Sequence, residues 1–174
     1  MRSLALALAA AAATIGQGAG PPALNPHWST VLAGEEARSL TQQCSRPSPG
    51  HADLLFAPTA AEIAALEAGL APLLATKLAE YWSEQPTLAP GDYYRQYAGF
   101  VVSGRRKIYV NGFHRHVVDG DAQLRAHGMN VPDWRHTAER ICDGGWLTFG
   151  VEYDPATKQF SNFAFNGAFR RPGK

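Results

Sequence analysis

The sequence predicts an α+β domain, with N-terminal helices (one of them long) packed on a four- to five-stranded antiparallel meander sheet. Two observations support this. Apolar residues recur at three- and four-residue steps before residue 82, as in an amphipathic helix, whereas after residue 92 they alternate, as in strands. Helices followed by strands joined by short loops are typical of α+β domains. A long helix covering one face of the sheet would bury the apolar sides of both.

The first 20 residues have the pattern of a secretory signal peptide. Arg2 supplies the positive start, Leu4 to Ile15 is an apolar run, and small residues follow. The run is shorter than the roughly 18 apolar residues that a membrane span needs. An uncleaved N-terminal anchor is the less favoured alternative. We therefore expect cleavage near Gly18 to Gly20 and an exported protein, either periplasmic or secreted.

The remaining chain is expected to form a single globular domain in two parts. Residues 21–58 form an N-terminal extension with a short helix, and residues 59–174 form the long helix and the sheet. Roughly 155 residues are typical of one domain. No other stretch is apolar enough to span a membrane, and no oligomeric state is predicted.

Helical signals dominate the first half. A short helix is expected within Ser29 to Cys44, and Arg46 to Gly50 breaks it. Thr59 and Glu62 have the spacing of a capping box, in which each side chain binds a free backbone N–H of the other residue. One apolar stripe follows, formed by Ile63, Leu66, Leu70, Leu73, Leu74, Leu78 and Tyr81. Pro72 interrupts this stripe, so a kink or break is expected at Gly69 to Pro72.

Strand signals dominate the second half. The expected strands are Tyr93 to Val102, Lys107 to Phe113, His136 to Cys142, Gly145 to Tyr153 and Phe160 to Phe169. Ser103 and Gly104 form a two-residue hairpin signal between the first two strands. The polar stretch from His114 to Asp133 contains a short helix, Asp121 to His127, which Gly128 ends.

Cys44 and Cys142 are the only cysteines. In an exported chain one such pair predicts a disulfide. Closing a loop of nearly 100 residues would stabilise the domain by about 4–5 kcal/mol in the chain-entropy description. A nucleophilic role for Cys142 is the alternative, but no Cys-His signature surrounds it.

The segment Cys142 to Gly145, with the sequence CDGG, resembles two kinds of loop. Glycines can form an anion-binding nest, but phosphate loops lead into helices, and this one leads into a strand. Asp-Gly between extended segments is a strong hairpin signal. A hairpin is therefore predicted, and no phosphate site.

His114 and His116 are the best candidate metal ligands. Alternation along a strand would place both imidazoles on one face, with a third ligand drawn from His127, His136, Asp119 or Asp121. No recognisable spacing supplies that third ligand, so exposed polar side chains at a strand end are the favoured interpretation. No metal and no cofactor are expected, and no catalytic residue is assigned.

A candidate ligand face is formed by Tyr93, Arg95 and Tyr97, because aromatic side chains beside a cation can stack on a ligand. Packing within a half-buried strand is the alternative. Glu152 is a lone carboxylate of the sheet and weak support for acid–base chemistry. The chain has no G-x-S-x-G, H-E-x-x-H or P-loop sequence.

Charge argues against a nucleic-acid partner. Without Arg2, 15 Lys and Arg balance 15 Asp and Glu. The bases are scattered, although the segment up to Tyr94 is net acidic and the rest net basic. A balanced surface does not attract nucleic acid or acidic lipid strongly.

The blocks YYRQYAGFVVSGRRKIYVNGF and CDGGWLTFGVEYDPATKQFSNFAFNG, between Tyr93 and Gly167, resemble a group of uncharacterised exported bacterial proteins. The shared features are a Tyr-rich strand, a G-[KR]-[KR]-x-[IV]-Y return, a DGG turn and a closing YD…F…FNG block. The resemblance implies bacterial origin and export but no activity. The order of elements is also similar to cystatin-like and PepSY-like domains, which often bind other proteins.

These patterns favour an exported, non-catalytic domain that binds another envelope or extracellular protein, or an envelope ligand. The open sheet face or the loop from His114 to Asp133 would be used. The alternative is a zinc hydrolase built on His114 and His116. A purely structural envelope protein is the third hypothesis.

Overall fold

The computed structural model describes residues 25, 27–81 and 88–167. Its strands are β1 (Ser29–Val31), β2 (Leu54–Phe56), β3 (Tyr93–Val102), β4 (Arg105–His114), β5 (Thr148–Asp154) and β6 (Gln159–Phe165). Its helices are α1 (Gly34–Leu40), α2 (Ala60–Tyr81) and α3 (Arg115–Ala126), with short 3₁₀ turns at Pro90–Asp92 and Gly145–Leu147. The expected signal peptide lies outside the described residues. No helix in the described ranges is long and apolar enough to cross a membrane.

The α+β class is confirmed, but the sheet is mixed and six-stranded rather than a four- to five-stranded antiparallel meander. Its order is β1-β3-β4-β5-β6, and β2 also pairs with β3. β1 runs parallel to β3, with Ser29 opposite Arg95, whereas β2 runs antiparallel to it, with Leu54 opposite Val101. Both added strands come from the N-terminal extension, and three residues are too few to show a strand period.

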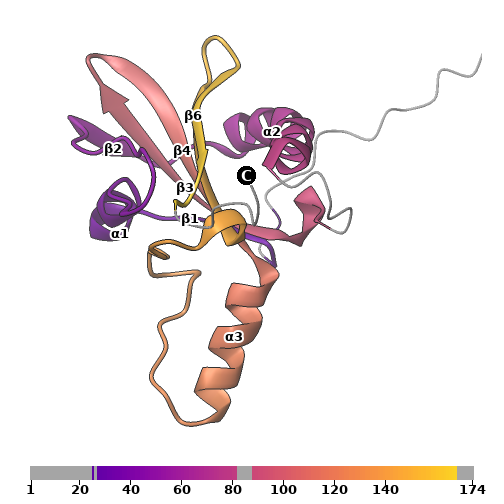
Figure 1. Ribbon diagram of the computed structural model, residues 1–174. Helices are drawn as coiled ribbons and strands as arrows, with labels where there is room; N and C mark the ends of the chain where they lie inside the picture. Colours follow the sequence, from indigo (N-terminus) through magenta and orange to yellow (C-terminus); the bar gives the residue numbers. More distant parts are fainter. Residues whose placement is uncertain (1–24, 26, 82–87, 168–174) are drawn as a thin grey trace, which may run out of the picture.

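One face of the sheet packs against α2, which Figure 1 shows on the opposite side of the sheet from α1. The buried stripe of α2 consists of Ile63, Leu66, Leu70, Leu74 and Leu78. Full burial of such a side chain stabilises a fold by about 1.5–3 kcal/mol. The sheet contributes Tyr93, Tyr97, Ile108, Val110, Phe149, Val151 and Tyr153 to the same core.

The capping box at the start of α2 is confirmed. Thr59 N donates to Glu62 Oε2 at 2.8 Å, and Glu62 N donates to Thr59 Oγ1 at 3.2 Å. Of the kink or break expected at Gly69 to Pro72, the break does not occur: α2 is one continuous helix through Pro72. Packing along the whole apolar stripe outweighs the local cost of the proline.

The opposite face is covered by α1 and by irregular chain. A second apolar cluster joins Leu32, Ala37, Leu40 and Ala52 to Ala98, Phe100 and Tyr109. The short helix expected within Ser29 to Cys44 is α1, which is preceded by β1. The Ser103-Gly104 hairpin is confirmed: both residues have positive φ, and Val102 is opposite Arg105.

Three local predictions are wrong. Residues 136–142 form no strand, because amide side chains of the sheet, rather than a neighbouring strand, bind their backbone. CDGG is therefore no hairpin but a turn with positive φ at Asp143 and Gly145, leading into a 3₁₀ turn before β5. Helix α3 begins at Arg115 rather than Asp121, because the His114 side chain caps it by accepting from His116 N at 3.3 Å.

Candidate functional site

The most prominent feature outside the core is a projecting arm, which we define as α3 together with its return segment, residues 127–133. Figure 1 shows α3 extending away from the sheet. None of its residues is buried, and residues 122–130 are all exposed. Helices of globular proteins owe most of their stability to packing, which α3 largely lacks.

The tip of the arm carries two exposed apolar side chains. Gly128 N donates to Arg125 O at 2.9 Å, and Met129 N donates to Leu124 O at 3.1 Å. With φ of +80° at Gly128, these bonds form a Schellman motif, which brings the residues at the positions of Leu124 and Met129 together. The two side chains are 40% and 49% exposed. The chain therefore presents apolar surface at its outermost point.

The return segment is held against α3 by one arginine. Arg125 donates from Nε to Val131 O at 3.0 Å and from Nη2 to Pro132 O at 2.6 Å. These contacts fix the shape of the tip without covering it. Fixed charges on residues 115–135 balance, with three arginines and three aspartates. The arm is thus a near-neutral surface with an apolar end.

Aromatic packing anchors the base of the arm. Trp134 is 1% exposed and its ring lies 5.1 Å from Tyr94 and 5.7 Å from Phe113, measured between ring centroids. The exposed Trp28 extends this cluster, 5.1 Å from Tyr94. The rigid sheet therefore determines where the arm leaves the domain.

A buried polar network continues from this base across the same sheet face. Gln96 Nε2 donates to Trp134 O at 2.5 Å and to Thr137 O at 2.8 Å. Asn111 Nδ2 donates to Gln96 Oε1 and Glu139 O, both at 3.0 Å, and Glu139 N donates to Gln96 Oε1 at 2.9 Å. Two amide side chains thus hold residues 134–139 on the sheet in place of a strand.

Arg46 is the centre of this network and is 7% exposed. Its Nε donates to Tyr109 Oη at 2.9 Å, and its terminal nitrogens donate to the side-chain oxygens of Asn111 and Asn166. Burial lowers the pKa of the guanidinium, and the contact with Tyr109 opposes that shift. No carboxylate within the described ranges pairs with it, so three neutral oxygens satisfy this buried cation.

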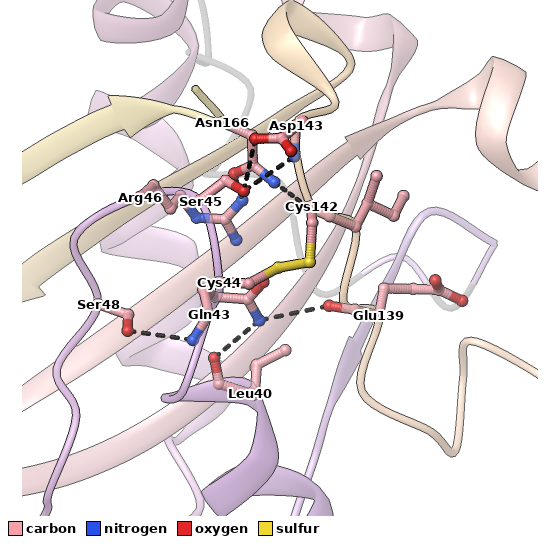
Figure 2. The surroundings of a disulfide bond; sticks show 11 residues. Leu40, Gln43, Cys44, Ser45, Arg46, Ser48, Glu139, Cys142, Asp143 and Asn166 are labelled. Carbon is pink, nitrogen blue, oxygen red and sulfur yellow. Dashed lines mark hydrogen bonds between the residues drawn. A yellow bond between two sulfur atoms is a disulfide. The ribbon is translucent and has the colours of Figure 1, made fainter. Parts of the chain in front are cut away.

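Cys44 and Cys142 form a disulfide, with their Cα atoms 5.5 Å apart. Figure 2 shows this bond beside Arg46 and Asn166, between the loop after α1 and the CDGG turn. Ser45 Oγ donates to Asp143 Oδ1 and accepts from Asp143 N, each at 2.9 Å. The motif-like CDGG segment is therefore part of a structural clasp.

The Glu139 carboxyl is the most perturbed acid in the described part of the chain. Its pKa is raised to about 7, mainly by burial and then by the nearby Asp121 carboxylate of α3, while Arg125 opposes both effects. The pKa of Asp121 is also raised, because the effect of burial outweighs the opposing effect of Arg125. Proton binding at the junction between arm and sheet is therefore expected near neutral pH.

His114 and His116 lie together, but not as alternating strand residues. His114 ends β4 and is 3% exposed, whereas His116 is exposed in the first turn of α3. Their ring centroids are 4.5 Å apart, and both lie near Trp146. Burial, and then His116, lower the pKa of His114. Among the described residues no group of three His, Cys, Asp or Glu is placed to hold a metal.

The residues of the candidate ligand face lie in the interior. Tyr93 and Tyr97 are fully buried beneath α2, where Tyr97 Oη donates to Glu67 Oε1 at 2.6 Å and Tyr93 Oη donates to Trp146 O at 2.8 Å. Arg95 Nε forms an ion pair with Glu67 Oε1 at 3.3 Å that lacks hydrogen-bond alignment. Arg95 also donates to Tyr93 O and Pro90 O. These side chains therefore pack the core rather than line an open face.

Sequence reasoning missed the residues that position the arm, namely Arg46, Gln96, Asn111, Glu139 and Asn166. Gln96 and Asn111 did carry a signal, because each is an amide whose neighbours two positions away on the same strand face are apolar. Arg46 carried none, since its partners lie 63 to 120 residues away in sequence.

The chain matches no protein-family model, and comparison with curated proteins and with solved structures likewise gives no match.

Proposed function

We propose that this domain binds another protein through the tip of the arm and has no catalytic role. The observation that supports this most directly is that α3 buries none of its residues while Leu124 and Met129 are exposed at its end. A contiguous apolar tip on a defined backbone is suited to insertion into an apolar pocket of a partner.

The charge of the arm favours a protein over a nucleic acid or an acidic membrane. Within the arm, Arg115 and Arg125 stand against Asp119, Asp121 and Asp133, and Arg135, just after the arm, offsets the third aspartate. Surfaces that bind phosphate backbones or anionic lipids carry an excess of lysine and arginine. The expected partner site is therefore an uncharged pocket with room for two unbranched or γ-branched side chains.

The expected export of the chain determines the compartment in which the partner would be found. The disulfide supports a location outside the reducing cytosol. The proposed partner is therefore a periplasmic, envelope or extracellular protein.

The test compares the loss of apolar surface at the tip with the loss of an exposed apolar side chain elsewhere. A Leu124→Ser/Met129→Ser variant removes the tip, whereas Leu54→Ser removes an equally apolar side chain, 63% exposed, from β2. A photo-crosslinker at Gln123 identifies the partner from an envelope extract, and titration with the purified partner follows. We expect the tip variant to weaken binding at least tenfold and Leu54→Ser to leave it unchanged. Equal effects of both, or binding to zwitterionic or anionic vesicles instead of a protein, would contradict the proposal.

A zinc hydrolase is the second candidate, favoured only by the proximity of the His114 and His116 rings. The His114 Nδ1 atom already accepts a hydrogen bond from His116 N, which leaves Nε2 as its free nitrogen. Elemental analysis of protein purified without a His-tag distinguishes the zinc hydrolase from the binding domain. Stoichiometric zinc that is lost in a His114→Ala/His116→Ala variant would favour the hydrolase over the binding domain.

A further inference from the structure

The Cys44–Cys142 disulfide lies at the surface, although it adjoins a buried network. Cys44 and Cys142 are both exposed residues, whereas Arg46, two positions after Cys44, is buried. Thiol–disulfide exchange requires that a thiolate reach a sulfur atom, so exposure favours reactivity. Disulfides that serve stability alone in exported proteins are usually protected from such attack.

The two loops that the disulfide joins are also held by hydrogen bonds. Ser45 and Asp143 exchange two of them at 2.9 Å, and Gln43 Nε2 donates to Glu139 O at 3.3 Å. Gly167 N donates to Ser45 O at 2.8 Å, and Asn166 donates to Ile141 O. Figure 2 shows the Ser45, Gln43 and Asn166 side chains on either side of the sulfur atoms. None of these hydrogen bonds involves a sulfur atom.

If the bond opens while the hydrogen bonds persist, the two thiols remain neighbours on a folded domain and can be oxidised again. A disulfide whose loss unfolds its loops leaves the two thiols far apart, so that its reoxidation must wait for refolding.

We propose that Cys44–Cys142 is a site of reversible thiol–disulfide exchange, with dithiol reductants and their disulfide forms as the chemical class of reactant. A reductant thiolate attacks one sulfur and forms a mixed disulfide, while the other cysteine leaves as a thiolate and takes up a proton. The second thiol of the reductant then displaces the first cysteine. Two electrons and two protons pass to the pair, and the reductant becomes a disulfide.

The test is reduction under native conditions. Folded full-length protein is incubated with dithiothreitol at pH 7.5, quenched with an alkylating agent and weighed by intact mass spectrometry. We expect two alkylated thiols per chain, at a rate proportional to the dithiol concentration and unchanged by urea below the unfolding transition. Near-ultraviolet circular dichroism should keep its folded signature, and removal of dithiothreitol in the presence of oxidised glutathione should restore the disulfide.

Two outcomes would overturn the proposal: reduction that occurs only at the rate of global unfolding, and loss of the near-ultraviolet signal on reduction of the wild-type protein. A Ser45→Ala variant tests the clasp itself. It should be reduced as fast as wild type but reoxidise several-fold more slowly, whereas Ser161→Ala, an exposed serine of β6, should match wild type in both steps. A Ser45→Ala protein with wild-type reoxidation would show that the hydrogen bonds do not hold the thiols together.

Discussion

Gly150 of β5 lies directly beneath the Arg46 side chain: a Cβ added at Gly150 would be 2.5 Å from Arg46 Nε and 2.3 Å from Tyr109 Oη. The absence of a side chain here leaves the space in which the guanidinium reaches Tyr109, Asn111 and Asn166. One glycine therefore permits the network that holds the return of the arm.

Substitution Gly150→Ala is expected to lower the free energy of unfolding by about 2–4 kcal/mol, since it overpacks the site and removes hydrogen bonds of a buried cation. Urea unfolding measures the change. Gly91→Ala is the control, because nothing lies within 4 Å of its added Cβ. A Gly150→Ala protein as stable as the Gly91→Ala protein would contradict the packing described for Arg46.

Substitution Gly120→Ala is expected to stabilise α3 locally. Gly120 is inside the helix and a Cβ there would meet open space. Alanine inside a helix is more favourable than glycine by about 0.5–1 kcal/mol of helix stability. Amide hydrogen exchange should slow two- to fivefold within α3 and remain unchanged in β3 and β4. Faster exchange in α3 would mean that the glycine is required by a contact of the arm.

The Glu139 carboxyl should make stability depend on pH. Because its pKa in the folded state, about 7, lies above the ordinary value, the folded protein binds this proton more tightly than the unfolded chain does. Its contribution is complete below about pH 4.5 and is lost as pH rises through 7. Glu139→Gln is therefore expected to raise Tm relative to wild type at pH 8 but not at pH 5.

The control for this experiment is Glu35→Gln, at a carboxylate whose side chain is 90% exposed. It should shift Tm by the same small amount at both pH values. If Glu139→Gln lowers Tm equally at pH 5 and pH 8, the carboxyl acts through packing or a hydrogen bond, and the proposed proton binding is wrong.

The capping box at the start of α2 is expected to contribute to the stability of the domain. Thr59→Ala removes the acceptor of the Glu62 N–H and is expected to cost about 1 kcal/mol. Thr59→Ser keeps the hydroxyl and should restore most of that loss. Equal destabilisation by both variants, measured by urea unfolding, would show that the methyl group rather than the cap is responsible.

The elements that sequence predicted well are those whose signal is local and long. The stripe from Ile63 to Leu78 and the alternation within Tyr93–Val102 each extend over several periods, so α2 and β3 were located closely. β1 and β2 are too short for a period, and their extended form depends on pairing with β3. The start of α3 was missed because Val117, Val118 and Gly120 are poor helix formers and the cap is an unusual histidine.

The candidate site was predicted only in outline. The polar stretch after His114 was one of two proposed binding regions, beside the open sheet face, and the disulfide was predicted from two cysteines in a chain expected to be exported. The buried positions of Tyr93, Arg95 and Tyr97 could not be read from their sequence, because alternation defines two faces of a strand without saying which is covered. The amides that bind residues 134–139 carry a signal of their own, but their partners are backbone groups, which leave no sequence pattern.

The parallel pairing of β1 with β3 has a consequence for the order in which the chain folds. Ser29 is opposite Arg95, so β1 cannot form until β3 has been synthesised and aligned. Its hydrogen bonds close a loop of more than 60 residues, whereas β3 and β4 are joined by a two-residue turn. Loop-closure entropy delays such distant pairings. We therefore expect the N-terminal extension, although first to be synthesised, to join the sheet last and to leave the edge of β3 open to other strands until then.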